Sequence, residues 1–216
     1  MKKTLLFLLG GSPAYPAYAA EFCAACGGAS AEIAILGQSR AGLEKHGNGI
    51  VQPMQAQGVR KFTWIAPGDD GQMDWAAATE TIRQASGIFI CGGNTAVYHK
   101  LYVQSPLAGI IRKRFLAGVP LAGVSAGALI SMEQLRLSPD ETGGEGLRLV
   151  RGLGLVSGFV IAVHYSEQGL QTELREVMRR SGSRLGYGID EPAVLVCEDG
   201  QVVRLLGGVH RVELDA

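Results

Sequence analysis

Short apolar runs, separated by longer segments of mixed polarity, recur along the whole chain. Each run is rich in Leu, Ile, Val, Phe or Ala, and they occupy residues 4–9, 32–36, 62–66, 87–91, 120–124 and 159–163. Runs of this length are typical of buried strands. Because helical segments alternate with them, the pattern predicts an α/β fold with a mostly parallel sheet covered on both faces.

The segments between the runs predict helices at two places. Asp74 is a suitable N-cap for a helix that continues to Gln84. The segment 101–117 predicts another helix, broken near Pro106.

The pattern changes beyond Gly188. Apolar runs at 193–197 and 202–206 flank the turn dipeptide Asp199-Gly200, which predicts a β-hairpin. The sheet is therefore expected to end in an antiparallel edge.

Composition narrows the class of protein. The chain has 216 residues, 47% of them hydrophobic, which is enough for one substantial core and predicts a single domain over residues 1–216. Twenty basic and twenty acidic residues give no net charge, so neither nucleic acid nor an anionic membrane is expected as a partner. A small neutral or zwitterionic ligand fits better.

The first residues imitate a secretory signal. Met1-Lys2-Lys3, an apolar stretch and Ala17-Tyr18-Ala19 have the order of a signal peptide with its cleavage site. The apolar stretch is short, however, and ends in Gly10-Gly11-Ser12, a strand-to-loop transition. We interpret it as the first buried strand and expect a cytoplasmic protein, since cleavage would remove part of the sheet. No stretch of the sequence approaches transmembrane length.

Two of the four cysteines have a spacing that can indicate redox chemistry or half of a zinc site. They are Cys23 and Cys26, and the others are Cys91 and Cys197. No second Cys/His pair completes four ligands, and the flanking alanines favour a packed helix in which cysteine is a small apolar residue. No metal and no cofactor are expected.

A Gly-x-Ser-x-Gly motif directly follows an apolar strand. In Gly123-Val124-Ser125-Ala126-Gly127, a sharp strand-to-helix turn would expose the Ser125 oxygen, as in a nucleophile elbow. The two glycines let strand and helix approach closely, and the Ala126 amide would face a developing oxyanion. The alternative is an ordinary glycine-rich loop between a strand and a helix.

Ligands of open parallel sheets collect at the carboxyl ends of the strands. Gly92-Gly93-Asn94-Thr95 follows one strand, and the Gly93 amide is a candidate second oxyanion donor, although a helix start capped by Asn94 or Thr95 explains the motif equally well.

A candidate general base follows a later strand. His164 comes directly after residues 159–163, at a rigid strand end suited to take a proton from Ser125. The other three histidines are weaker candidates, because His46 is expected in a polar loop, His99 in a helix and His210 in the hairpin near the carboxyl end.

Two adjacent carboxylates, Asp190 and Glu191, end another buried strand. Such groups are costly to desolvate unless paired, so one of them is expected to orient a cation, an imidazole or a loop. Glu191 is the first candidate for holding His164, with Asp190 close behind and a plain exposed turn before Pro192 as the alternative.

Five motifs in order resemble the cyanophycinase and aspartyl dipeptidase (peptidase E) family of serine peptidases, built on a class I glutamine amidotransferase-like, flavodoxin-like fold. They lie at 87–95, 123–128, 152–155, 164–165 and 188–196. The resemblance implies a three-layer αβα sandwich, with Ser125 as nucleophile, His164 as base and Glu191 as acid. Glu133 or Asp140, between the serine and the histidine, would be poorly matched equivalents of an acid assigned in the dipeptidase branch.

The chain departs from the family pattern at two places that concern the substrate. The family commonly has an aspartate where this chain has Ala162, and cyanophycinases follow the histidine with several arginines where this chain has only Arg175. The resemblance therefore argues against cyanophycin as substrate.

The expected function is a serine peptidase or amidohydrolase that cleaves a small peptide through an acyl-enzyme. Gly92, Gly93, Asn94 and Ala126 are expected to form its oxyanion and substrate-binding site. Two alternatives remain: an α/β-hydrolase esterase using Ser125, Asp190 and His210, and a catalytically silent small-molecule-binding protein. Family members often pair, so the partners expected are a small peptide or amide and a second copy in a homodimer.

Overall fold

A seven-stranded sheet forms the centre of the computed structural model, which describes residues 3–144 and 146–215. Its strands, in spatial order, are β11 (Gln201–Leu206), β10 (Val194–Glu198), β1 (Leu5–Leu9), β5 (Leu121–Val124), β4 (Gly87–Ile90), β2 (Glu32–Leu36) and β3 (Lys61–Ile65). The neighbouring strands β1, β5, β4, β2 and β3 run parallel to one another. In contrast, β10 pairs antiparallel with both β1 and β11. The predicted mostly parallel sheet with an antiparallel C-terminal hairpin is confirmed.

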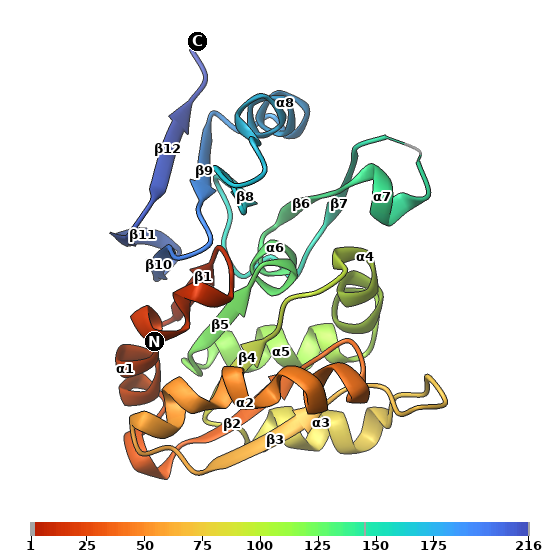
Figure 1. Ribbon diagram of the computed structural model, residues 1–216, viewed down its shortest axis with the longest axis vertical. Helices are drawn as coiled ribbons and strands as arrows, with labels where there is room; N and C mark the ends of the chain where they lie inside the picture. Colours follow the sequence, from red (N-terminus) through yellow and green to blue (C-terminus); the bar gives the residue numbers. More distant parts are fainter. Residues whose placement is uncertain (1–2, 145, 216) are drawn as a thin grey trace.

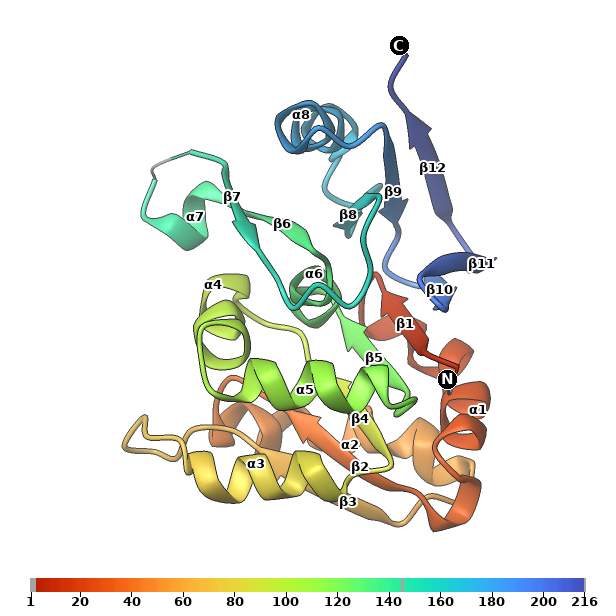
Figure 2. The ribbon, with the colours of Figure 1, turned by 180° about the vertical axis from the view of Figure 1, so that it is seen from behind.

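Helices cover both faces of this sheet. In opposite views, α1 (Tyr15–Ala25) and α2 (Arg40–Ala56) lie on one face, and α3 (Trp75–Gln84) and α5 (Leu107–Leu116) on the other (Figures 1 and 2). The side chain of Asp74 accepts a hydrogen bond from the Ala77 amide at 3.0 Å, as expected of the N-cap of α3. The short helix α4 (Thr95–Tyr98) and a π-helical turn at His99–Val103 precede the break at Pro106.

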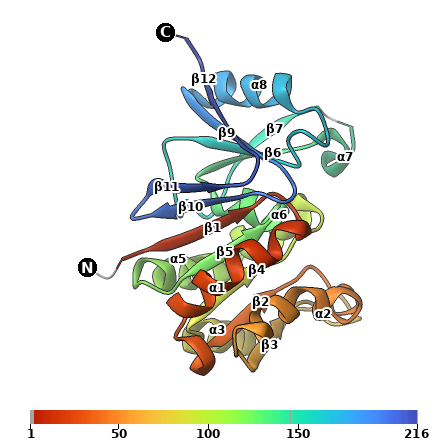
Figure 3. The same ribbon diagram turned by 60° about the vertical axis from the view of Figure 1, so that its left-hand side comes forward.

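The remaining strands form two smaller sheets beside the central one (Figure 3). β8 (Val160–Val163) runs parallel to β9 (Leu185–Ile189), β12 (Val209–Glu213) pairs antiparallel with β9, and α8 (Gln171–Ser181) packs on them. β6 (Gln134–Leu137) and β7 (Arg148–Arg151) form an antiparallel ribbon. The short helix α7 (Pro139–Thr142) lies in the connection between these two strands. The run at 159–163 is therefore a strand as predicted, but it belongs to the three-stranded sheet.

Two histidine placements were wrong. His46 lies in α2, not in a polar loop, because Ser39 caps the helix by accepting from the Gly42 amide at 3.1 Å and a stripe including Leu43, Ile50 and Met54 is buried. His210 lies in β12, whose partner is β9, and not in the hairpin formed by β10 and β11.

The first strand lies deep inside the sheet. Four consecutive residues of β1, Leu6 to Leu9, have 0% exposure, and the strand is hydrogen-bonded between β10 and β5. The interpretation of this segment as a buried strand is confirmed. Across the part of the chain that the structure describes, no helix is both long and apolar enough to cross a membrane.

All four cysteines are buried and free. Burial raises the pKa of Cys23 to about 11 and that of Cys197 to about 12, so these thiols stay protonated at neutral pH. Within the described residues, no group of three or more His, Cys, Asp or Glu side chains is placed to hold a metal ion. The interpretation of Cys23 and Cys26 as packing residues of a helix agrees with their place in and just after α1.

Candidate active site

Ser125 occupies the sharp turn between β5 and the helix α6 (Ala126–Ser131). Its backbone has φ 52° and ψ −112°, a conformation that costs a non-glycine residue about 1–3 kcal/mol and persists only where the surroundings impose it. The Ser125 amide donates to the Leu9 carbonyl at 3.0 Å, which ties the turn to the end of β1. The side chain is thereby presented at the carboxyl edge of the sheet.

The two glycines of the motif have the steric role that the sequence indicated. A Cβ on Gly127 would lie 2.3 Å from the Ile90 carbonyl oxygen, and one on Gly123 would lie 2.5 Å from the Gly127 carbonyl group. Both contacts are with backbone atoms that cannot move aside cheaply. The tight approach of β5, α6 and β4 therefore depends on glycine at both positions.

The structure brings His164 to Ser125. His164 follows β8 with φ 53°, and its Nε2 lies 2.8 Å from the Ser125 hydroxyl oxygen. The Tyr165 amide donates to the Ile189 carbonyl, and the Tyr165 ring occupies the space where a Cβ on Gly188 would lie. These contacts hold the loop after β8 against β9.

Glu191 meets the other side of the imidazole. Its Oε1 lies 2.9 Å from His164 Nδ1, so both ring nitrogens are engaged, one by the serine and one by the carboxylate. An Nδ1–H donated to Glu191 leaves Nε2 as an acceptor for the serine proton. The Glu191 amide donates to Glu167 Oε1 at 3.0 Å, which fixes the backbone beneath the carboxylate.

Asp190 has a different partner. Its Oδ2 lies 2.9 Å from His210 Nε2, and its Oδ1 accepts from the Ser166 amide at 3.0 Å. Burial raises the pKa of Asp190, but the hydrogen bonds from His210 and Ser166 lower it more, and the net pKa lies below its ordinary value. Asp190 thus fastens the loop that carries His164 to β12.

The alternative triad of Ser125, Asp190 and His210 is not assembled. His210 Nε2 is shared between Asp190 and the Ser166 hydroxyl, the latter at 3.4 Å, whereas the imidazole at Ser125 is that of His164. Glu133 and Asp140, the candidates between serine and histidine, are exposed.

The Gly92-Gly93-Asn94 loop lies beside Ser125. A Cβ on Gly92 would lie 3.3 Å from the Ser125 Cβ, and Gly93 has φ 152°, which favours glycine. The Asn94 amide donates to Gln38 Oε1 at 2.8 Å, and the Asn94 side chain caps α4 by accepting from the Val97 amide at 3.0 Å. Asn94 therefore has the helix-capping role that the sequence left open, while Gly92 and Gly93 line the cleft.

A cleft of about 520 Å³ opens at Ser125 and His164. Its walls come from loops and helices that sequence reasoning did not assign to the site: Gly11, Ser12, Tyr15, Gly37, Gln38, Ser39, Leu43, His46, Ile50, Cys91 and Tyr98. Five of them, at 11–12 and 37–39, follow β1 or β2 directly, so the rule that ligands collect at strand ends, applied to the first two strands, would have found these five. His46 was missed because its helix was missed.

Comparison with known proteins places the chain in a family. The model of peptidase family S51 matches residues 71–205, more than half of the sequence. The chain belongs to peptidase family S51. The matched range includes Ser125, His164 and Glu191.

Relatives of this S51 chain include cyanophycinases of cyanobacteria. The cyanophycinase of Synechococcus elongatus is 25% identical over 190 residues, which cover 86% of this chain and 59% of the relative. That of Geminocystis herdmanii is 25% identical over 192 residues, covering 87% of this chain and 70% of the relative. The chain thus spans only about three fifths of the first of these cyanophycinases.

Two solved structures share the fold. A protein from Listeria monocytogenes EGD-e assigned to peptidase E superposes with a TM-score of 0.70 at 16% identity, covering 99% of this chain and all of that one. A peptidase from an acI-B1 Actinobacterium gives 0.72 at 18% identity, covering 98% and 97%. The predicted relationship to cyanophycinases and peptidase E is confirmed.

Proposed function

We propose that this S51 protein is a serine peptidase in which Ser125 is the nucleophile, His164 the general base and Glu191 the residue that orients the histidine. The observation that carries the proposal is the continuous chain of contacts from the Ser125 hydroxyl through both nitrogens of His164 to Glu191, at 2.8 and 2.9 Å. Family membership supports the same reaction class.

The reaction follows from this geometry. His164 Nε2 takes the hydroxyl proton while the Ser125 oxygen attacks the carbonyl carbon of a peptide or amide bond. The resulting imidazolium, stabilised by Glu191, gives that proton to the leaving amine as the C–N bond breaks. Water then attacks the acyl-enzyme by the same route, which releases the acid and restores the serine.

The oxyanion of each tetrahedral intermediate needs donors beside Ser125. We assign this role to the amides of Gly93, in the loop that lines the cleft, and of Ala126, the first residue of α6. Loss of one such donor costs about 3 kcal/mol of barrier in a serine peptidase. That the protein works in the cytoplasm and as a homodimer stays a prediction.

Turnover of a peptide library by Ser125→Ala tests the proposal. We expect peptide cleavage to fall by roughly 10⁴-fold or more, because the bond-forming oxygen is removed, while the far-ultraviolet circular dichroism spectrum stays that of the unmodified chain. Hydrolysis retained in this variant, or none by the unmodified protein, would refute the proposal, and the latter would favour a silent binding protein.

A further inference from the structure

A second and larger hollow, here called the acyl groove, adjoins the cleft. It has a volume of about 910 Å³ and is lined by residues of three segments: 38–41, 67–75 from the loop after β3 to the first residue of α3, and 97–106 from α4 to Pro106. The loop between β3 and α3 projects on the same side of the molecule as α4 (Figures 1 and 2).

Apolar side chains stand exposed in the acyl groove. Trp75 is 39% and Val97 40% exposed, and the less exposed side chains of Met73 and Leu101 also line the groove. Exposed aromatic and aliphatic side chains within a concave surface are the usual anchors for an apolar group of a ligand.

The charges of the acyl groove differ from those of the cleft. Arg40 and Lys100 line the groove with a single acid, Asp69, and neither cation has an ion-pair partner among the described side chains. The cleft, in contrast, is lined by no Asp, Glu, Lys or Arg of the described residues. A negatively charged group of a ligand is therefore favoured in the groove, beside Arg40 and Lys100. In the cleft at Ser125, no described arginine or lysine is placed to pair with such a group.

The two hollows are neighbours. Gln38 and Ser39 line both of them, so an extended chain bound at Ser125 can pass over these residues into the groove. Gln38 is itself fixed, because its Oε1 accepts from the Asn94 amide.

The order of the strands gives the direction of the bound chain. Glu191 packs against Gly11, where a Cβ would lie 3.0 Å from it, so the His164–Glu191 pair is on the β1 side of Ser125. Gln38 follows β2 and Pro67 follows β3, on the opposite side in the order β1, β5, β4, β2, β3. The leaving amine must lie beside His164, which protonates it, and the acyl part then extends toward the groove.

We propose that the acyl groove binds residues on the acyl side of the scissile bond and selects an apolar side chain together with an acidic one. This inference rests on the proposed peptidase function and extends it: the substrate is a peptide of several residues, uncharged at the scissile residue and acidic farther along its acyl side.

Matched coumarin amides test the acyl groove. The short substrates are acetyl-Xaa-coumarin, with Xaa a mixture of uncharged residues, and the long ones add Leu, Glu and Gly in all orders before Xaa. We expect kcat/KM of the long set to exceed that of the short set about tenfold, since remote contacts strengthen transition-state binding. Replacing Glu by Lys in the long set removes that gain.

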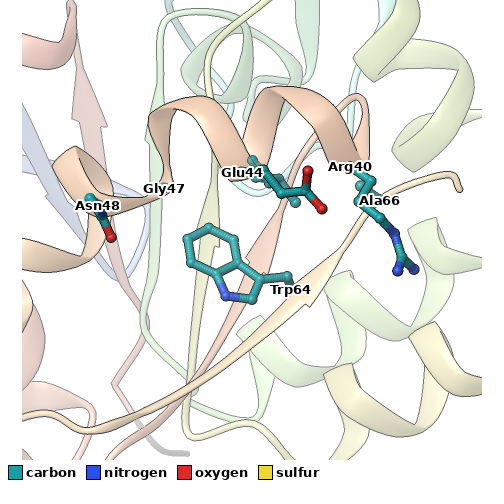
Figure 4. Close-up of a pocket in the computed structure, with 7 residues that line it drawn as sticks. Arg40, Glu44, Gly47, Asn48, Trp64 and Ala66 are labelled. Atoms are coloured by element: carbon teal, nitrogen blue, oxygen red, sulfur yellow. The ribbon is translucent and has the colours of Figure 1, made fainter. Parts of the chain in front are cut away.

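Two variants and two matched controls locate the effect. Trp75→Ala should lower the long-to-short ratio of kcat/KM about tenfold, and Lys100→Glu should reverse the preference for Glu over Lys in the substrate. Trp64→Ala is the control for Trp75, because Trp64 is 40% exposed but lines a different hollow, between β3 and α2 (Figure 4). Lys113→Glu, exposed on α5, is the control for Lys100.

The outcomes separate this inference from the peptidase proposal. Cleavage of short substrates with no gain for the long acidic ones would overturn the groove alone, as would an equal effect of Trp64→Ala and Trp75→Ala. If neither set is cleaved by the unmodified protein, the peptidase proposal itself fails together with the inference.

Discussion

At the level of single residues, the serine and the histidine of the site both have positive φ angles, 52° at Ser125 and 53° at His164. Positive φ is uncommon outside glycine, and it persists where tertiary contacts impose it. Here the Ser125 amide is bonded to the end of β1, and Asp190 and Glu167 anchor the segments on either side of the His164–Glu191 contact. Strain at these two positions is a means of pointing two side chains at each other.

The two adjacent carboxylates should differ in their effect on catalysis. Glu191→Gln should lower kcat by roughly 10²- to 10⁴-fold, because the amide no longer holds the His164 tautomer that accepts the serine proton. Asp190→Asn should lower kcat by only about tenfold, since Asp190 acts through the loop at Ser166. Steady-state kinetics of both variants decides between them, and a larger loss in Asp190→Asn would contradict the assignment of Glu191.

At the level of elements, the site depends on the close approach of β4, β5 and α6. Gly127→Ala should lower the free energy of unfolding by about 3 kcal/mol, because its Cβ would lie 2.3 Å from the Ile90 carbonyl oxygen. Gly109→Ala in α5 is the matched control, since nothing lies within 4 Å of its Cβ, and it should raise that free energy by about 0.5–1 kcal/mol. Urea unfolding measures both, and equal stability of the two variants would contradict the packing described.

Strands with a continuous apolar run were predictable from the sequence. Elements that depend on contacts with residues far away in the sequence were not. β1, β2, β4 and β5 are buried on both faces and read directly from the sequence. β12 is mostly exposed and pairs with β9, about twenty residues earlier, which no local signal shows. The helix α2 was missed because Gly47 has low helix propensity, yet a side chain there would lie 2.9 Å from the Trp64 ring.

For the site, the same distinction holds. His164 and Glu191 were predictable as partners because each follows a buried strand, and the parallel strands β8 and β9 bring their carboxyl ends together. Ser125 follows β5 of the central sheet, and its place beside them was indicated by the nucleophile-elbow motif and the family resemblance instead. The separate pairing of Asp190 with His210 was not predictable, since it depends on the register of β12 against β9. The cleft wall at His46 was likewise hidden, because it depends on a helix that local propensity disfavours.

At the level of the whole molecule, the central sheet is closed by a strand from the beginning of the chain and a hairpin from its end. β1 pairs in register with β10, residue for residue from Leu5 against Glu198 to Leu9 against Val194. The first strand and a strand from the last quarter of the sequence therefore pair inside one sheet, next to the strand that leads to Ser125. The single-domain organisation predicted for residues 1–216 remains a prediction.

Removal of residues 1–19, as cleavage after Ala19 would produce, should prevent folding. Each apolar side chain of β1 that is fully buried contributes about 1.5–3 kcal/mol, and four of them together are comparable with the whole stability of a typical domain, about 5–15 kcal/mol. We expect the shortened chain to show no cooperative thermal transition in calorimetry. A cooperative transition with retained peptidase activity would show that β1 is dispensable.

The most direct test of the central claim is covalent labelling with a fluorophosphonate, with the modified residue identified by mass spectrometry. The account predicts that the label attaches to Ser125 and that His164→Ala slows the labelling roughly 100-fold or more, because the base that activates the hydroxyl is gone. Labelling at Ser166, or labelling of Ser125 at an unchanged rate in His164→Ala, would contradict it.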